Sequence, residues 1–324
     1  MSIFTVPKHL IRIGLLIAAA GVAGSVAAKS FPSRPLTIIV PYAAGATDKQ
    51  ARQIAEIASR ELGQPIVVEN RDGAGGTIGA NFVASSQPDG HTILYGAPAV
   101  ITVAPLTGAA QYRYDSLKGL ARANIIPHLI AARIDAPFKT IPELVAYAKA
   151  NPGKVTFGSP GNGTAVHLAG EAFADAAGIK LTHVPFRGVA PAVTAASGGF
   201  VDLVFGAPGA INPQIQGGRL IALAQLGATR TNELASVPTV REQGVDLALG
   251  ADFGFFVPKG TPPEAMARLV SAIKVAVESE DFRKSVTNAL SSPAFLGAAD
   301  YQKVVDNERD IYARIVPKLS LGNK

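Results

Sequence analysis

Strand-like hydrophobic segments alternate with helix-like amphipathic segments along most of the chain. Residues 35–42 form a short β-branched run, and residues 46–63 follow with apolar positions three and four apart, as on one helix face. Residues 65–70 and 91–97 repeat the strand pattern, with a short helical segment over 77–86 between them. This alternation with short loops predicts a mostly parallel sheet flanked by helices. The expected buried face of the first helix consists of Ala51, Ile54, Ala55, Ala58 and Leu62.

A second unit of the same kind begins near residue 128. Its expected elements are strand 128–134, helix 140–151, strand 154–159, helix 165–178, strand 181–186, helix 191–197, and strands 200–206 and 219–227. Beyond 250–262 the pattern changes to charged amphipathic helices with no strands among them, so we expect these helices to return to the first unit. The predicted domains are therefore 29–127 together with 252–324, and 128–251, with a cleft between them.

The first 28 residues have the parts of a secretory signal peptide. Lys8 and Arg12 precede an apolar run over 13–28, and Val26 and Ala28 occupy the small positions before a cleavage site. The run is about sixteen residues, short of the roughly twenty that a membrane span needs. We expect export to the periplasm with cleavage near Ala28. The chain has no cysteine, which excludes a lipid-anchored form.

Charge and cysteine content exclude several functional classes. The chain has 30 basic and 24 acidic residues, so the mature part without Lys8 and Arg12 carries a formal charge of +4. This charge is spread without a Lys/Arg run, which argues against nucleic-acid binding. The absence of cysteine removes disulfides, zinc–thiolate sites and thiol catalysis together.

Three glycine-bearing loops lead from a predicted strand into a predicted helix, over residues 41–48, 70–79 and 158–163. Thr47 is a candidate N-cap with Gln50 as its capping-box partner. Each loop presents unpaired backbone N–H groups at the positive end of a helix, where an anion binds favourably. In open α/β sheets such loops gather at the carboxyl ends of the strands, so we expect them to meet at the cleft.

Nucleotide binding is poorly supported by these loops. None contains the glycine–lysine–Ser/Thr ending of a Walker A motif. The two Gly-x-Gly pairs, beginning at Gly73 and Gly161, lack the third glycine of a dinucleotide fingerprint, because Ile78 and Val166 occupy that position.

The sequence gives little support for a catalytic site or a metal site either. Ser159 lies near His167, but it is not in a nucleophile elbow and no acidic residue is evidently placed to orient the imidazole. With Thr164 as N-cap, His167 is the third helical residue and is more simply a polar helix-start side chain. His91, His128 and His183 are isolated at strand starts and show no metal-ligand spacing. We expect no metal and no cofactor.

Reversible binding of an anion by backbone N–H groups and hydroxyls remains the preferred interpretation. A few charge-assisted contacts of about 1.5–3 kcal/mol each, with burial, reach the roughly 8 kcal/mol of a micromolar complex. Arg187 is the one basic residue in a glycine/proline loop that we place near the cleft, although it could equally be a rim residue paired with a surface carboxylate.

From about Phe31 to the C-terminal helix the chain resembles the Bug family, the periplasmic solute-binding components of tripartite tricarboxylate transporters. The resemblance is carried by the segments FPSRPLTIIVPYAAGATD, LGQPIVVENRDGAGGTIGANFVASSQPDGHTIL, AYAKANPGKVTFGSPGNGTAVHLAGEAF, HVPFRGVAPAVTAASGGFVDLVF and GFFVPKGTPPEAMARL. It implies a two-domain α/β periplasmic binding protein, type II-like, with mostly parallel sheets flanked by helices. Such a protein closes on a small organic carboxylate and delivers it to membrane permease subunits.

The resemblance also implies which residues hold the ligand carboxylate, partly through ordered water. In the first domain these are Tyr42, Ala43, Ala44, Gly45, Thr47, Asp48 and Thr77. In the second domain they are Ser159, Gly161, Asn162, Gly163, Thr164 and His167. Arg187 and Ala207 complete the predicted ligand-binding set.

Two departures from the family pattern bear on the ligand. The first loop is one residue shorter than usual and lacks a Gly-Gly pair, which reduces the space beside the ligand. Gly206, Ala207 and Pro208 occupy the place where members often have an Asp. Because this carboxylate is missing, we expect a ligand without an amino group, such as a dicarboxylate or an aromatic acid.

Two other functions stay open at this point. An exported hydrolase could use Ser159 and His167, and a ligand-occupied sensor could use the same cleft to signal through a membrane kinase. A diffusing carrier is expected to be a monomer.

Overall fold

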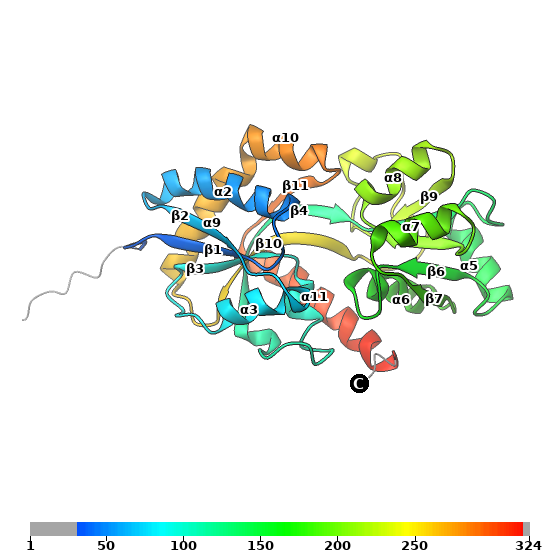
Figure 1. The fold of residues 1–324 in the computed structure, drawn as a ribbon, viewed down its shortest axis with the longest axis horizontal. Coiled ribbons are helices and arrows are strands. Elements are labelled where there is room, and N and C mark those ends of the chain that lie inside the picture. The colour runs from blue at the N-terminus through cyan, green and yellow to red at the C-terminus, as the bar shows by residue number, and fades with distance from the viewer. Residues whose placement is uncertain (1–30, 320–324) are drawn as a thin grey trace, which may run out of the picture.

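The computed structural model describes residues 31–319, and its strands form two separate sheets (Figure 1). The first sheet has the order β11 (Ser292–Leu296), β4 (Leu117–Pro127), β10 (Gly250–Pro258), β3 (Thr92–Gly96), β1 (Leu36–Val40) and β2 (Ile66–Asn70). The second has the order β7 (Thr182–Pro185), β6 (Thr156–Ser159), β8 (Leu203–Gly206), β5 (Leu129–Arg133) and β9 (Leu220–Gln225). We call each sheet with its helices a domain.

Helices cover both faces of each sheet. Those of the first domain are α2 (Ala46–Leu62), α3 (Thr77–Ala84), α4 (Ala99–Thr102), α9 (Pro263–Glu278), α10 (Glu280–Asn288) and α11 (Ala298–Ile315). Those of the second are α5 (Ile141–Ala150), α6 (Ala165–Ala177), α7 (Val189–Ser197) and α8 (Pro208–Gln216). Single 3₁₀ turns lie at Ala74–Gly76, Tyr114–Ser116, Asn232–Leu234 and Val316–Lys318. Residues 31–319 contain no helix that could cross a bilayer.

The alternation of side chains along each strand builds two cores per sheet. On β1, Leu36, Ile38 and Val40 pack with α2, α9 and α10, whereas Ile39 packs on the opposite face with α3 and α11. Figure 1 shows these two groups of helices above and below the first sheet. The expected buried residues of α2 are all buried, so the helix is oriented as its sequence pattern predicts.

Both sheets are mixed, whereas the sequence pattern predicted mostly parallel ones. β1 pairs in parallel with β2 and β3, but β10 joins β3 and β4 in antiparallel, and β11 joins β4 in the same way. In the second sheet, β6 is parallel to β7 and β8, and β5 is antiparallel to β8 and β9. The antiparallel strands β4, β10 and β11 were not predicted, and neither were the helices α4 and α8.

Three segments connect the domains. The chain crosses at His128, between β4 and β5, and returns through residues 226–249 to β10. The third connection is α11, whose Tyr301 and Val305 are buried in the first domain, whereas Ile311 and Tyr312 are buried among core residues of the second. The domain limits at residues 127 and 252 stay a prediction.

Candidate functional site

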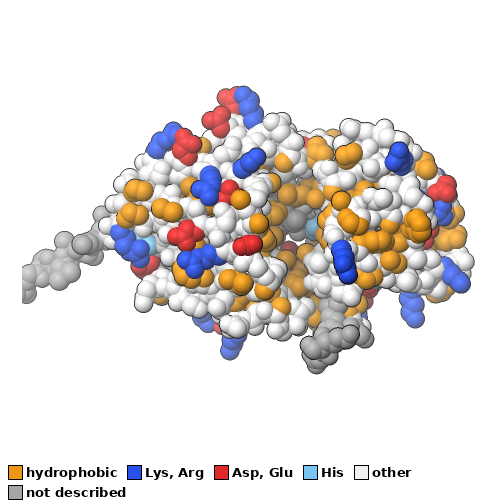
Figure 2. Space-filling view, viewed as in Figure 1, with side chains coloured by type: hydrophobic (Ala, Val, Ile, Leu, Met, Phe, Trp, Pro, Cys, Tyr) orange, Lys and Arg blue, Asp and Glu red, His pale blue; other side chains and the backbone are white. Residues whose placement is uncertain are grey.

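A cavity of about 450 Å³ lies between the two domains. Figure 2 shows the surface hollowed at this junction. Residues of the first domain that line it are Tyr42, Ala74, Gly75, Thr77, Ala97, Ala99, Val100, Val103, Ala104, Thr107 and Ala109; those of the second are Asn162, Gly163, Thr164 and Ala165. The second and third glycine loops therefore face each other across the cavity, as the sequence predicted.

The structure brings together some of the sequence-predicted residues and not others. Tyr42, Thr77, Asn162, Gly163 and Thr164 line the cavity. The predicted residues outside its lining are Ala43, Ala44, Gly45, Thr47, Asp48, Ser159, Gly161, His167, Arg187 and Ala207.

The first loop differs from its predicted geometry. α2 begins at Ala46 with Gly45 as N-cap, so Thr47 lies inside the helix and does not cap it. Asp48 is buried and forms an ion pair with Arg52 at 2.9 Å, so its carboxylate is already partnered. The first-turn N–H groups of α2 have no intrahelical acceptors, as at the start of any helix.

The second loop is a tight glycine turn that brings its backbone close to the cavity wall. Gly73, Gly75 and Gly76 all have positive φ, and a Cβ at Gly76 would lie 2.8 Å from Val100 Cγ1, so only glycine fits there. Thr77 Oγ1 donates a hydrogen bond to the carbonyl of Ala74 at 3.0 Å, which closes the turn.

Tyr42 joins this loop to the cavity wall. Its hydroxyl accepts a hydrogen bond from the N–H of Ala97 at 3.3 Å, and its carbonyl accepts one from Asn70 Nδ2 at 2.9 Å. Burial raises the pKa of Tyr42 to about 12, so the phenol stays neutral.

The third loop uses several of its own donors internally. The N–H of Gly163 donates to His167 Nδ1 at 3.0 Å, and the N–H of Gly161 donates to Ser159 Oγ at 3.2 Å. Thr164 caps α6 as predicted, since its Oγ1 accepts from the N–H of His167 at 3.2 Å. These contacts fix the loop, and they leave fewer N–H groups for a ligand than its sequence suggested.

The donors that remain at the second-domain wall come from Asn162 and the start of α6. The Asn162 amide is exposed and forms no hydrogen bond with any described residue. The N–H groups of Ala165 and Val166 lie in the first turn of α6, where no intrahelical acceptor exists. The positive end of the α6 dipole therefore faces the cavity.

The cavity wall opposite α6 was missed by sequence reasoning. Residues 97–109 supply Ala97, Val100, Val103 and other small apolar side chains, on α4 and the turns after it. A run of alanine and valine gives no signal that separates a ligand-facing wall from ordinary core. No charged side chain appears among the residues that line this cavity.

The Ser159–His167 pair that a hydrolase would use is not formed in the structure. Ser159 Oγ lies 2.6 Å from His183 Nε2, with no hydrogen bond to His167, and Ser159 is fully buried. His167 stacks on His183 with ring centroids 3.7 Å apart and points Nε2 toward Glu171 at 3.6 Å. Burial and the adjacent His167 lower the pKa of His183 to about 4.

Arg187 and Ala207 are not among the residues that line this cavity. Arg187 is exposed on the loop after β7, and its guanidinium forms no ion pair among residues 31–319, so the predicted alternative of a surface carboxylate partner is not seen either. Ala207 is the N-cap residue of α8 and supplies no side-chain hydrogen bond. The described residues also hold no cluster of three potential metal ligands.

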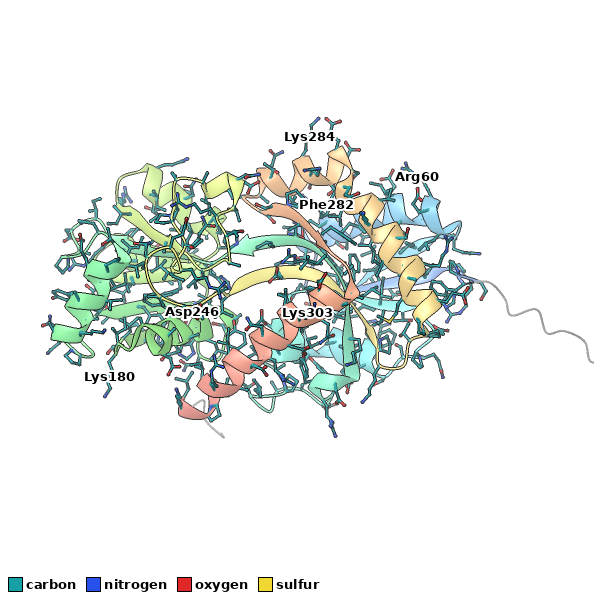
Figure 3. The ribbon with its side chains drawn as sticks, turned by 180° about the vertical axis from the view of Figure 1, so that it is seen from behind. Arg60, Lys180, Asp246, Phe282, Lys284 and Lys303 are labelled. Carbon is teal, nitrogen blue, oxygen red and sulfur yellow. The ribbon has the colours of Figure 1, made fainter. Side chains whose placement is uncertain are left out.

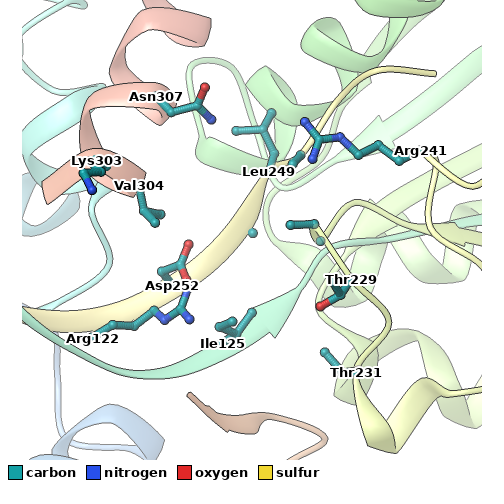
Figure 4. A pocket seen from close by; sticks show the side chains of 14 residues that line it. Arg122, Ile125, Thr229, Thr231, Arg241, Leu249, Asp252, Lys303, Val304 and Asn307 are labelled. Atoms are coloured by element: carbon teal, nitrogen blue, oxygen red, sulfur yellow. Dashed lines mark hydrogen bonds and ion pairs between the residues drawn. The ribbon is translucent and has the colours of Figure 1, made fainter. Parts of the chain in front are cut away.

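A second cavity, of about 420 Å³, lies where β4 and β10 pass between the domains. Figure 4 shows its wall, where Arg122 of β4 and Asp252 of β10 form a partly buried ion pair at 2.9 Å. Lys303 of α11 also lines it and lies over β10 when the molecule is seen from behind (Figure 3). Burial raises the pKa of Asp252 against the opposing effect of Arg122. None of the sequence-predicted residues lines this cavity.

The chain has relatives along nearly its whole length. It is 35% identical over 302 residues to the UPF0065 protein in the gbd 5' region of Cupriavidus necator, covering 91% of this chain and 90% of that protein. It is 34% identical over 278 residues to the protein BugT of Bordetella pertussis, covering 84% and 85%.

Solved structures share the fold. A TctC solute-binding protein from Polaromonas, solved without ligand, has a TM-score of 0.82 at 31% identity, over 90% of this chain and all of that one. MatC of Rhodopseudomonas palustris with bound malate has a TM-score of 0.66 at 30% identity, over 88% and 100%. An R. palustris protein with adipate has a TM-score of 0.68 at 27% identity, over 89% and 98%.

The family profile described as tripartite tricarboxylate transporter family receptor matches residues 50–321. The predicted two-domain binding-protein fold and the predicted Bug relationship are thereby confirmed. This chain belongs to the family of tripartite tricarboxylate transporter receptors.

Proposed function

We propose that this protein captures a small organic carboxylate in the cavity between its domains and delivers it, chemically unchanged, to the membrane subunits of a tripartite transporter. The main support for this proposal is that both domains line one cavity, and that the start of α6 and the Asn162 amide present N–H donors to it. Malate and adipate in two related structures support a carboxylate as the guest.

Recognition without a charged side chain fits a ligand that is bound and later released. A carboxylate at the start of α6 gains charge-assisted hydrogen bonds and the helix dipole. Contacts of about 1.5–3 kcal/mol each reach micromolar binding when a few of them combine with burial. The buried Ser159 supports binding without conversion, because its hydroxyl is turned to His183 inside the second domain.

Closure of the two domains is part of the proposal. The TM-score is 0.82 against the ligand-free relative and 0.66 and 0.68 against the two carboxylate complexes, at similar identities. A rotation of one domain against the other lowers a whole-chain score without changing either domain. Hinge rotation of this kind closes two-domain periplasmic binding proteins around their ligands, and we expect this protein to close in the same way. The hinge would lie near residues 127 and 252, the proposed limits of domain 1 (29–127 and 252–324) and domain 2 (128–251).

The proposed location is the periplasm, after cleavage of a signal peptide near Ala28. Residues 1–30 lie outside the described part of the chain, so this proposal rests on their sequence and on relatives that are periplasmic binding proteins. We infer a monomeric carrier whose partners are the ligand and the permease subunits.

A titration of refolded protein tests the function. Refolding removes any co-purified guest, and a thermal-shift panel of mono-, di- and tricarboxylates then identifies binders by mass action. Small-angle scattering with the best binder is expected to give a smaller radius of gyration. A panel without a single stabilising carboxylate, or a radius unchanged at saturation, contradicts the proposal.

A matched pair of variants tests the site. Asn162→Ala removes a side-chain donor at the cavity and is expected to weaken carboxylate binding by about tenfold. Asn288→Ala changes an exposed amide at the end of α10 and is expected to bind as the wild type does. Equal affinities of the two variants would remove Asn162 from the binding site.

A further inference from the structure

A carboxylic acid is buried directly behind one wall of the interdomain cavity. Helix α4 is a single turn whose Ala99 and Val100 line the cavity. Its Thr102 is turned to α11 instead, with Oγ1 2.6 Å from Glu308 Oε1. Glu308 is 5% exposed. One short helix therefore separates this acid from the proposed ligand.

Glu308 has no cation beside it. Three acidic residues are buried among residues 31–319, and two of them, Asp48 and Asp252, pair with arginines. Glu308 forms no ion pair with any described residue, and its hydrogen-bond partner is the Thr102 hydroxyl. A buried carboxyl without a cation favours its protonated form, and burial raises the pKa of Glu308 to about 8.

The groups nearest to Glu308 do not compensate a negative charge on it. The carboxylate of Asp252 on β10 disfavours ionisation of Glu308 further. Burial raises the pKa of Tyr42, Tyr301 and Tyr312, so these phenols near Glu308 stay neutral. An ionised Glu308 is therefore an uncompensated negative charge next to the cavity.

The elements packed against α11 supply no free cation to Glu308 either. Their other titratable groups are Lys118 and Arg122 on β4, His167, Glu171 and Asp175 on α6, and Lys318. Arg122 is paired with Asp252. Lys318 is paired with Asp175, and Lys118 is exposed. His167 has its Nε2 3.6 Å from Glu171.

Two negative charges on opposite sides of one helix repel each other inside a protein. An α-helix with its side chains is about 10 Å across, and at this separation, with an effective dielectric constant of about 20, the repulsion changes a binding constant roughly tenfold. We propose that Glu308 is a proton-binding site of the carrier, which takes up a proton from solvent when a carboxylate enters the cavity. This inference rests on the proposed function and adds the proton as a second bound species.

The sign of the effect follows from the ionisation of Glu308. Carboxylate affinity is expected to be highest while Glu308 is protonated and to fall as Glu308 ionises above about pH 8. Two other groups near the cavity do not titrate in this range. Burial raises the pKa of Tyr42 to about 12, and burial with the adjacent His167 lowers the pKa of His183 to about 4. Carboxylate ligands are themselves ionised above about pH 5.

Titrations at two pH values test the coupling. The probes are the members of the mono-, di- and tricarboxylate panel that stabilise refolded protein at pH 6.5, with malate and adipate always included. Between pH 6.5 and pH 9.5 the wild type is expected to lose at least about fivefold in affinity, with circular dichroism showing that it is folded at both. Equal affinities at the two pH values overturn the inference and leave the proposed function intact, whereas a panel without any binder overturns both.

Two variants assign the effect to Glu308. Glu308→Gln keeps the shape of the side chain but cannot ionise, so its affinity at pH 9.5 is expected to equal its own affinity at pH 6.5 within about twofold. Glu61→Gln, at an exposed position on α2, is expected to keep the loss of affinity seen in the wild type. A loss that persists in Glu308→Gln assigns the pH dependence to another group and contradicts the proposal.

Proton uptake gives a test that needs no variant. Isothermal titration of the wild type at pH 8.5 in Tris and in HEPPS, two buffers of different ionisation enthalpy, counts the protons bound with each ligand molecule. An uptake of about half a proton is expected, because Glu308 is partly ionised in the free protein and more protonated in the complex. No uptake, or a release of protons, overturns the inference.

Discussion

Replacing Glu308 by glutamine tests the electrostatics beside the proposed cavity. Glu308 lies on α11, is 5% exposed, and has Oε1 2.6 Å from Thr102 Oγ1 on α4, the helix that forms one cavity wall. Thr102 Oγ1 also lies 3.2 Å from the carbonyl of Pro98. When the Thr102 hydroxyl donates to Pro98, a protonated Glu308 can donate to Thr102, so the neutral acid satisfies the whole chain of contacts.

The magnitude follows from the raised pKa of Glu308. Burial, opposed by the Thr102 hydrogen bond and assisted by Asp252, raises this pKa from 4.5 to about 8. The folded state therefore binds more protons than the unfolded state between these values, so stability is fully present below pH 4.5 and falls as pH rises to about 8. The pKa of Glu308 is raised by about 3.5 units, and each unit corresponds to about 1.4 kcal/mol, so the free energy of unfolding falls by on the order of 5 kcal/mol over this pH range.

Glutamine keeps the shape and the hydrogen bond but cannot ionise. We expect Glu308→Gln to match the wild type near pH 4.5 and to exceed its free energy of unfolding by several kcal/mol at pH 9. Urea unfolding at both pH values, followed by circular dichroism, measures the difference. Glu61→Gln, an exposed position on α2, serves as the control for loss of a carboxylate. Parallel pH profiles of wild type and Glu308→Gln would show that Glu308 does not cause the loss of stability at high pH.

Three further outcomes are expected. Burial lowers the pKa of His128 from 6.5 to about 4, so the free energy of unfolding decreases as pH falls through this range. Between pH 7 and pH 4, His128→Phe should therefore lose on the order of 3 kcal/mol less of this free energy than the wild type in urea unfolding. An equal loss in the two proteins would contradict this. Gly170→Ala places a Cβ 2.5 Å from the Phe157 ring and should lower the stability by about 1–3 kcal/mol in thermal unfolding. The control Gly209→Ala places its Cβ no closer than 4.0 Å to any other atom and should change the stability little. Equal losses of stability in the two variants would rule out the steric cause. Intact mass of the exported protein should begin at Lys29, and a mass that includes residues 1–28 would contradict cleavage.

The sequence predicted the elements whose apolar pattern is continuous, and it missed those that polar residues interrupt. The buried face of α2 is as predicted, but β4 contains Arg122 and Asn124, which break its hydrophobic run. Asn124 is buried and Arg122 is partly buried, and both are tolerated because partners far along the chain satisfy them: Asp252 for Arg122, and Ser291 for Asn124. Such partners cannot be read from a local pattern.

The candidate site shows the same limit. Glycine and threonine spacing located two of the loops that meet at the cavity, and the cap at Thr164 was predicted from its residue type. The sequence could not show that His167 and Ser159 take up the N–H groups of Gly163 and Gly161, because these contacts depend on the folded loop. The apolar wall at residues 97–109 resembles ordinary core in sequence and becomes distinct only beside α6.

The most direct test of the central claim is a crystal structure of the protein with the tightest-binding carboxylate of the panel. We expect the carboxylate within hydrogen-bonding distance of Asn162 and the first turn of α6, with the rest of the ligand against Val100 and Val103 and the domains closed around it. A ligand in the cavity beside Arg122 and Asp252, or one held by a single domain with the junction left open, would contradict it.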